Sequence, residues 1–261
     1  MRIGVCKYCL EEKDLAQSHL IPAGVLKLCK QNGEILSLSS SVVQYTGRER
    51  QHPLLCKACD ASLSRFGEEW VIPRIARPFS FPIFELLNNE ALAYQDGVIK
   101  IYAAARIPEL DVDKMTHFAL GIFWKASTHS WRGKTAENLI ELGPYREELR
   151  AFLRRERGFP TYVSLIVSVQ PPPALSFTCE PYRARKIRVA NYGFYVPGVT
   201  FWLFVGKQLG SIKKNCFYSN PAHPIVVRDT KGQITDILQD VTRGAKISKR
   251  VMEGIKSRRP R

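Results

Sequence analysis

Two Cys-x-x-Cys pairs constrain the fold of this 261-residue chain more than any other feature of its sequence. One pair is Cys6 and Cys9, the other is Cys56 and Cys59, and this spacing occurs nowhere else in the chain. Each such turn presents both sulfur atoms to one ion, so the two turns supply four thiolates for a tetrahedral zinc site. Because four cysteine ligands leave no coordination position open, we expect a structural zinc ion.

The number and spacing of the cysteines favour metal binding over a disulfide framework. The chain has seven cysteines, an odd number, and four of them stand in the two pairs. The N-terminal residues lack the apolar run of a secretory signal, so we expect a cytoplasmic, reducing location. We interpret Cys29, Cys179 and Cys216 as small buried side chains.

The apolar content of the chain, 45%, predicts a packed globular core. Its longest apolar stretches, 162–169 and 194–206, are shorter than the roughly 20 residues that a membrane helix needs. They are rich in β-branched and aromatic residues, which is typical of buried strands. We therefore expect no membrane span.

Local patterns divide the chain into three parts. Residues 1–72 are predicted to form a zinc-knuckle module, 73–235 an α+β body, and 236–261 a C-terminal helix with a basic tail. The proline-rich stretch 73–84 marks the first boundary. The pattern of turn residues and apolar positions predicts four features in the body. They are a hairpin over 92–103, helices over 113–131 and 144–157, and antiparallel strands over 161–228.

The net charge of +15 makes polyanions the natural partner class, and the basic residues gather near the C-terminus. Residues 241–261 contain eight Lys or Arg and a single Glu. We expect nucleic acid as the partner, while a solvated basic end and a protein partner stay open as alternatives. The candidate nucleic-acid contacts are Lys246, Lys249, Arg250, Lys256, Arg258 and Arg259.

A histidine follows the first cysteine pair in the stretch SHLIP, where His19 stands ahead of Ile21-Pro22. A knuckle, then this histidine, then a second knuckle that runs into a helix, resembles the HNH endonucleases, whose ββα-metal core lies within a zinc-stapled frame. The stretches SHLIP, LLCKACDASLSRFGEEW and DVDKMTHFALGIFWK, within roughly the first 130 residues, also resemble a group of bacterial proteins of largely unassigned function. The resemblance implies a treble-clef or ββα module and a bacterial or phage setting.

The HNH resemblance implies roles for three residues. The first histidine of that family activates water for attack on a phosphodiester, which assigns the general base to His19. The family holds a divalent ion beside it, so the resemblance implies Mg²⁺ or a similar catalytic ion, with Asp60 and Glu68 as the candidate ligands. This chain departs from the family at two positions: Ser18 replaces the usual acid before the histidine, and Asp60 replaces the usual histidine after the last cysteine.

Structural roles are open for the same residues. Asp60 is also suited to cap the N-terminus of the following helix, and Glu68 to pair with Arg65 or Arg74 on the surface. His19 is also suited to a packing role beside the knuckle.

Two functional hypotheses follow, with a third that has less support. The first is a metal-dependent HNH-like nuclease with His19 as general base. The second is a non-catalytic zinc module that binds nucleic acid or a protein, which accounts better for the two departures. The third is a regulatory protein that senses a small ligand, for which the aromatic stretch 194–206 is the only indication.

Overall fold

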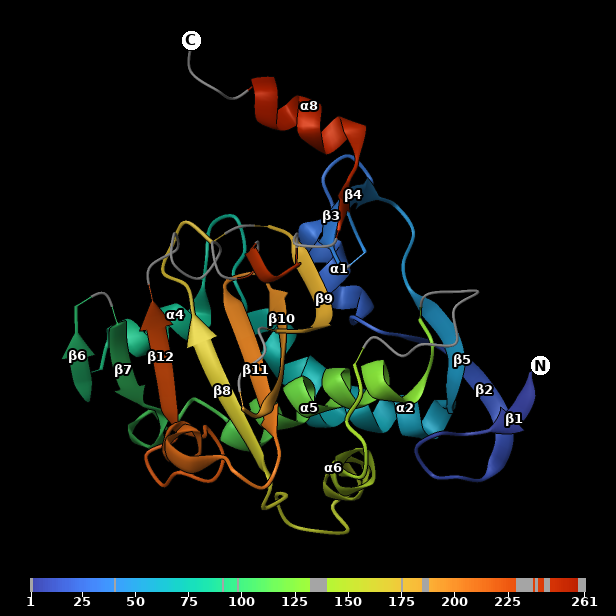
Figure 1. Ribbon diagram of the computed structural model, residues 1–261, viewed down its shortest axis with the longest axis horizontal. Helices are drawn as coiled ribbons and strands as arrows, with labels where there is room; N and C mark the ends of the chain where they lie inside the picture. Colours follow the sequence, from blue (N-terminus) through green and yellow to red (C-terminus); the bar gives the residue numbers. More distant parts are fainter. Residues whose placement is uncertain are drawn as a thin grey trace.

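The structure of the chain is a computed structural model that describes residues 2–39, 41–90, 92–97, 99–131, 140–174, 176–184, 188–228, 237, 239–241 and 245–257, without the side chains of 254–257. Two sheets and the helices beside them form an α+β fold, in agreement with the predicted class (Figure 1). No helix in these ranges is both long and apolar enough to cross a membrane.

The first cysteine pair lies in the turn between the first two strands of a small, three-stranded antiparallel sheet. In spatial order they are β1 (Ile3–Val5), β2 (Glu12–His19) and β5 (Gln51–Cys56). The chain runs from β5 directly into α2 (Lys57–Leu63), so the second cysteine pair spans the end of a strand and the first turn of a helix.

The excursion between β2 and β5 builds part of a second, larger sheet. It contains α1 (Ala23–Cys29), β3 (Ile35–Leu38) and β4 (Val42–Thr46). Strand β3 pairs in parallel with β9 (Thr178–Arg183), which comes from the second half of the chain. Residues on both sides of position 72 therefore share one sheet and one continuous hydrophobic core.

The large sheet has ten strands in the spatial order β13-β4-β3-β9-β10-β11-β8-β12-β7-β6. The strands not yet given are β6 (Tyr94–Asp96), β7 (Ile99–Ala103), β8 (Val163–Val169), β10 (Ala190–Val196), β11 (Val199–Val205), β12 (Pro224–Arg228) and β13 (Lys246–Ile247). The predicted antiparallel pairing over 161–228 holds for most neighbours, and the predicted hairpin is β6–β7. One exception is β12, which crosses over and pairs in parallel with β8.

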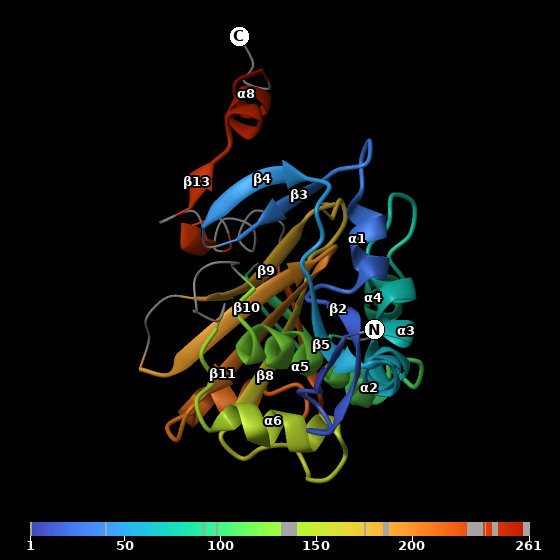
Figure 2. The ribbon, with the colours of Figure 1, turned by 90° about the vertical axis from the view of Figure 1, so that its right-hand side faces the viewer.

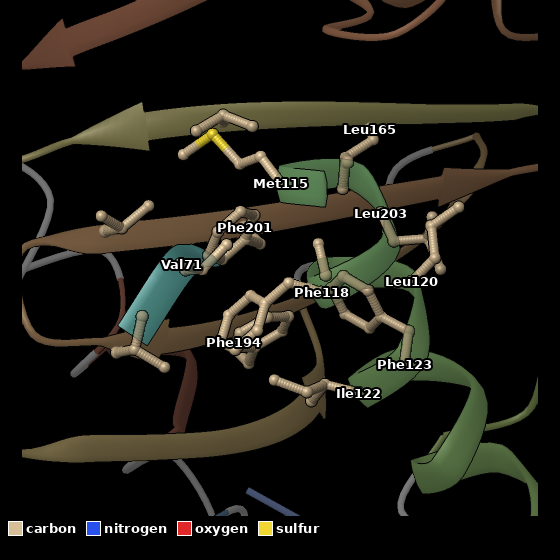
Figure 3. Packing of buried hydrophobic residues seen from close by; sticks show 14 of the residues in the cluster. Val71, Met115, Phe118, Leu120, Ile122, Phe123, Leu165, Phe194, Phe201 and Leu203 are labelled. Carbon is tan, nitrogen blue, oxygen red and sulfur yellow. The ribbon is translucent and has the colours of Figure 1, made fainter. Parts of the chain in front are cut away.

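Helix α5 (Val112–Thr128) lies on the central strands of this sheet, at the middle of the core (Figures 1 and 3). The ring of Phe123 lies 4.9 Å from that of Phe194 in β10, and Phe118 contacts Phe201 in β11 at 5.8 Å. The sequence predicts one buried face for this helix, but its residues 115–127 are all buried. They are buried because the helix is enclosed by the sheet, by the α2 segment and by α6 (Tyr145–Leu153).

The second cysteine pair begins a continuous helical segment, residues 57–74, that packs on α5. After α2 the segment has a π-helical turn at Ser64–Glu68, then α3 (Glu69–Val71) and a 3-10 turn at Ile72–Arg74. Gly67 allows the close approach, because a Cβ atom there would lie 2.7 Å from the backbone nitrogen of Phe118. A larger residue at position 67 therefore has no room.

Two predicted helices end at different residues in the structure. The helix predicted over 113–131 is α5, which ends at Thr128, and the one predicted over 144–157 is α6, which ends at Leu153. Arg155, with φ of 60°, departs from helical backbone just after α6, so the helix ends before position 157. A short helix not predicted from the sequence, α4 (Pro82–Asn88), begins at the end of the proline-rich segment.

The C-terminal segment continues the sheet at the β4 edge. Strand β13 pairs in parallel with β4, and α8 (Lys249–Ser257) extends beyond the sheet, away from α5 and α6 (Figures 1 and 2). The predicted final helix begins at about 236, and most of 229–244 lies outside the described residues. The helix that is described begins at Lys249.

Candidate functional site

The four paired cysteines converge into one cluster. Their sulfur atoms, in Cys6, Cys9, Cys56 and Cys59, all lie within 4.8 Å of one another. Zn–S bonds of about 2.3 Å in a tetrahedron place sulfur atoms roughly 3.8 Å apart, so small adjustments suffice to close the site. The backbone N–H of Cys56 donates to Cys6 Sγ at 3.3 Å. The cluster can therefore hold a metal ion such as zinc, as the cysteine spacing predicts.

The backbone of the first turn has the shape that directs two sulfurs to one point. The N–H of Leu10 donates to the carbonyl of Cys6 at 2.8 Å, and Leu10 has φ of 65°. The turn is fastened to the body through Tyr8, whose ring packs on Trp124 of α5 at 5.4 Å. Arg150 and Arg154 both donate to the Tyr8 carbonyl, so α6 also holds the turn.

The electrostatics of the cluster favour a bound cation. Burial, together with the neighbouring sulfur atoms, raises the pKa of the Cys59 thiol. Four thiolates in this space repel one another, and a divalent cation offsets that repulsion.

His19 lies at the end of β2, where the strand register places it opposite Gln51 of β5. Its Nε2 atom is 2.8 Å from Glu49 Oε2, and the other carboxylate oxygen of Glu49 accepts from Lys30 Nζ at 2.9 Å. The side-chain nitrogen of Gln51 lies 2.9 Å from His19 Nε2 and 3.4 Å from Glu49 Oε2. The side chain of His19 keeps 25% of its surface exposed, so it is neither packed in the core nor free.

This arrangement distinguishes the two ring nitrogens of His19. Hydrogen bonds from Lys30 and His19 hold the pKa of the Glu49 carboxyl below its usual range, so Glu49 is an anion near neutral pH. An anionic carboxylate accepts a proton donor, which places N–H at Nε2 of His19 when the Gln51 amide is turned so that its oxygen, rather than its nitrogen, faces the ring. The other nitrogen, Nδ1, is then the basic one. The geometry is that of a base oriented by a carboxylate.

A pocket with a cavity volume of about 210 Å³ adjoins this pair, and Glu49 is part of its lining. Arg50 also lines the pocket, donating to Glu180 Oε1 at 2.5 Å and to the carbonyl of Trp131 at 2.5 Å. Glu180 belongs to β9 of the large sheet. The pocket therefore lies between the segment that contains Glu49 and the large sheet.

Glu68 and Asp60, the predicted ion ligands, have separate surroundings. Glu68 Oε1 lies 3.5 Å from the ammonium nitrogen of Lys125, a buried residue of α5, rather than beside Arg65 or Arg74. Asp60 lies inside α2, whose N-terminal cap is Cys56, so the capping role considered for Asp60 is wrong. Among the residues that the structure describes, the four cysteines are the only group of three or more His, Cys, Asp or Glu close enough to share an ion. The assignment of Asp60 and Glu68 as ligands stays a prediction.

Three of the six candidate nucleic-acid contacts have described side chains, and all three are exposed. Lys246 lies in β13 and Lys249 in α8, while Arg250 pairs with Glu34 and lies over the ring of Tyr45 at 5.1 Å. The side chain of Lys256 is not described, and Arg258 and Arg259 lie outside the described residues.

Sequence reasoning missed the residues that hold His19 and line the pocket. Glu49 and Arg50 belong to the charged stretch GRERQ, which has no motif that marks a site. The available signal was the distance of each residue from the cysteine pairs: once β2 and β5 are aligned as antiparallel neighbours, His19 falls opposite Gln51, and the residues next to Gln51 become candidates.

Comparison of the chain with protein-family models, with curated proteins and with solved structures finds no match.

Proposed function

We propose that this protein hydrolyses phosphodiester bonds in nucleic acid, with His19 as the general base. The observation that carries the proposal is the contact between His19 Nε2 and Glu49 Oε2 at 2.8 Å, in a side chain that remains accessible to solvent. The resemblance of the knuckle and the SHLIP stretch to the HNH endonucleases supports the same role. The net charge of +15 suits a polyanionic substrate.

The chemistry follows from the orientation of the ring. Nδ1 of His19 accepts a proton from a water molecule as that water attacks the phosphorus atom. The imidazolium that forms lies beside the Glu49 carboxylate, which stabilises the positive charge. Lys30 fixes that carboxylate from its other oxygen, so the ring is oriented before substrate arrives.

Zinc at the four cysteines holds this arrangement in place. We assign the cluster to structural zinc, and the knuckle, the β2–β5 strand pair and α2 to a treble-clef-like module. The ion fixes the start of β2 to the end of β5, and the register of these strands sets the position of His19 relative to Gln51.

The proposal includes a divalent ion at the phosphate, as the resemblance implies. Apart from the cysteines, the described residues do not form a dedicated cage for Mg²⁺. We therefore assign no protein ligand to that ion and derive no step through it.

A second candidate function is nucleic-acid binding without catalysis. The observation that favours it is the Glu68–Lys125 pair, because it commits one predicted ion ligand to a contact with the core helix. In this case His19 and Glu49 form a structural pair at the end of the β2–β5 strand pair.

The deciding experiment is cleavage of supercoiled plasmid, circular single-stranded DNA and structured RNA at low salt, with Mg²⁺, Mn²⁺ or EDTA. We expect ion-dependent cleavage by the parent protein and a loss of at least about a hundredfold in His19→Ala. The matched control is His223→Ala, because His223 is a half-buried histidine in the loop before β12. Zinc content is measured in all three proteins, and the nuclease proposal fails if the parent binds nucleic acid without cleaving it.

A further inference from the structure

The pocket beside Glu49 has an unusual inner wall. Strand alternation directs Ser37 of β3 and both Gln44 and Thr46 of β4 to the same face of the large sheet, and all three line the pocket. Thr178 of β9 is the register partner of Ser37 and continues the row. A sheet face covered by a helix is normally apolar. Here Ile35 and Val42 share the face with a row of hydroxyl and amide groups, so the face is part apolar and part polar.

Part of this row is available for a ligand. Thr46 Oγ1 already accepts from the N–H of Arg48. By contrast, the side chains of Ser37 and Gln44 form no hydrogen bond within the described part of the chain, and both are half-buried. Half-buried donors and acceptors of this kind exchange bound water for ligand groups at little cost.

Most of the remaining side chains that line the pocket are either apolar or charged. Leu20 and Ile21, just before α1, and Leu26 within it contribute apolar surface to the same cavity. Arg48 is exposed, while Arg50 is held by Glu180 and by the Trp131 carbonyl. The cavity therefore combines apolar surface, a polar sheet face and exposed positive charge.

We infer that this pocket holds one unpaired nucleobase of the nucleic-acid strand on which His19 acts, so the substrate is single-stranded or has an extruded base. The inference rests on the proposed function and names its substrate class. A base has an apolar face for the leucine and isoleucine side chains and an edge of donors and acceptors for Ser37 and Gln44. Glu49 lines the pocket and also contacts His19, so a single side chain separates the bound base from the proposed general base.

The lining also argues against a free phosphate group as the occupant. The carboxylates of Glu49 and Glu180 balance the charges of Arg48 and Arg50 in the lining, so the cavity has no net positive charge to attract a free anion. The exposed guanidinium of Arg48 is instead suited to the backbone phosphate of a strand whose base enters the pocket. A base stacked and paired within a duplex cannot enter without extrusion.

The test separates binding from cleavage by using full-length, zinc-loaded His19→Ala protein. Fluorescence anisotropy measures its affinity for a labelled single-stranded DNA oligonucleotide, for the same strand with abasic residues, and for a duplex. We expect the affinity for the intact strand to be at least about fivefold higher than the affinity for the abasic strand. In this background, Ser37→Phe fills the cavity and Gln44→Met removes its amide, and each should reduce this preference. The matched control is Gln95→Met, because Gln95 is an exposed glutamine in β6 at the far edge of the same sheet.

Each outcome of this test has a definite meaning. Equal affinity for intact and abasic strands overturns the pocket assignment, and so does a preference that Ser37→Phe leaves unchanged at unaltered zinc content and thermal stability. Cleavage by the parent protein is measured on the same oligonucleotides. If the parent cleaves intact and abasic strands equally, the nuclease proposal stands and the base pocket is wrong. If base-dependent binding is seen without any cleavage, the pocket assignment stands and the nuclease proposal fails.

Discussion

In the proposed mechanism, Glu49 determines which nitrogen of His19 acts as the base, and replacing Glu49 tests that role directly. Glu49→Gln keeps the size of the side chain and removes its negative charge. We expect the turnover number to fall by about tenfold to a hundredfold with little change in KM, because the imidazolium loses its stabilising anion. Glu49→Asp should recover part of the rate.

The control for this prediction is Glu109→Gln, because Glu109 is an exposed glutamate before α5. If Glu49 has only a structural role, Glu49→Gln should instead lower the thermal stability and leave turnover by the remaining folded protein unchanged. That pattern would contradict a positioning role.

At the same scale, residues that belong to a motif could be predicted from the sequence. Residues that contact the motif only in the folded chain could not. The four cysteines share a spacing and their convergence is confirmed. Glu49 is 30 positions along the chain from His19, which it contacts. Lys30 is 19 positions from Glu49, which it contacts in turn. Their contacts depend on the path of the β2–β5 excursion, which no local pattern encodes.

A stacked histidine pair makes stability depend on pH. The rings of His52 in β5 and His129 after α5 lie 3.6 Å apart. Burial lowers the pKa of both, and the positive charges of Arg2 and Lys7 add to the effect on His52 and His129 respectively. The folded pKa values thus lie below the unfolded value of about 6.5, so the unfolded chain binds more protons as pH falls below it.

This pair is therefore stabilising above the unfolded pKa, and the stabilisation is lost as pH falls through the lower folded values. We expect the melting temperature to drop between about pH 6.5 and 5, and His129→Gln to drop less steeply. The difference between the two proteins is the measurement, because acid also weakens zinc binding in both. His223→Gln should follow the parent, and identical profiles for all three proteins would rule out the pair as the cause.

At the scale of elements, the close contact between the α2 segment and α5 depends on Gly67. Its added Cβ would meet backbone atoms of Phe118 at 2.7 and 2.8 Å, and backbone cannot rotate away. We expect Gly67→Ala to lower the free energy of unfolding by about 1–3 kcal/mol. Chemical denaturation measures the change.

Gly121 in α5 provides a matched control, because its nearest neighbour for an added Cβ is the Leu63 side chain at 3.7 Å. That is an ordinary contact, so Gly121→Ala should be neutral or stabilising by up to about 1 kcal/mol through helix propensity. Equal effects of the two substitutions would mean that the helices separate easily at position 67.

Local periodicity was sufficient to predict α5, α6 and the β6–β7 hairpin, because each is specified by its own residues. It was insufficient for the pairing of β3 with β9, which joins segments more than a hundred residues apart in the chain. Parallel pairing of distant strands leaves no short-range signal. The pocket lies on these joined strands, so the candidate site could not be assembled from the sequence, although its motif had singled out His19.

At the scale of the whole molecule, the positive charge should make nucleic-acid binding strongly dependent on salt. Exposed Lys246 and Lys249 lie on the C-terminal segment, and neither forms an ion pair within the described residues. If both bind phosphates, replacing them with glutamine lowers the slope of log affinity against log salt by about 0.7–0.9 for each phosphate that is no longer neutralised. Fluorescence anisotropy over a salt series gives that slope.

Lys100 and Lys207 are exposed lysines on β7 and after β11, and their double replacement with glutamine removes the same net charge from another part of the surface. If long-range attraction alone drives binding, the two double variants should behave alike. A smaller slope in the C-terminal variant alone would show that its lysines bind phosphates directly, because counterion release depends on the phosphates neutralised rather than on the net charge of the protein. Unchanged slopes in both would contradict a role for the C-terminal segment and would leave the surface around Arg48 as the place where the strand is bound.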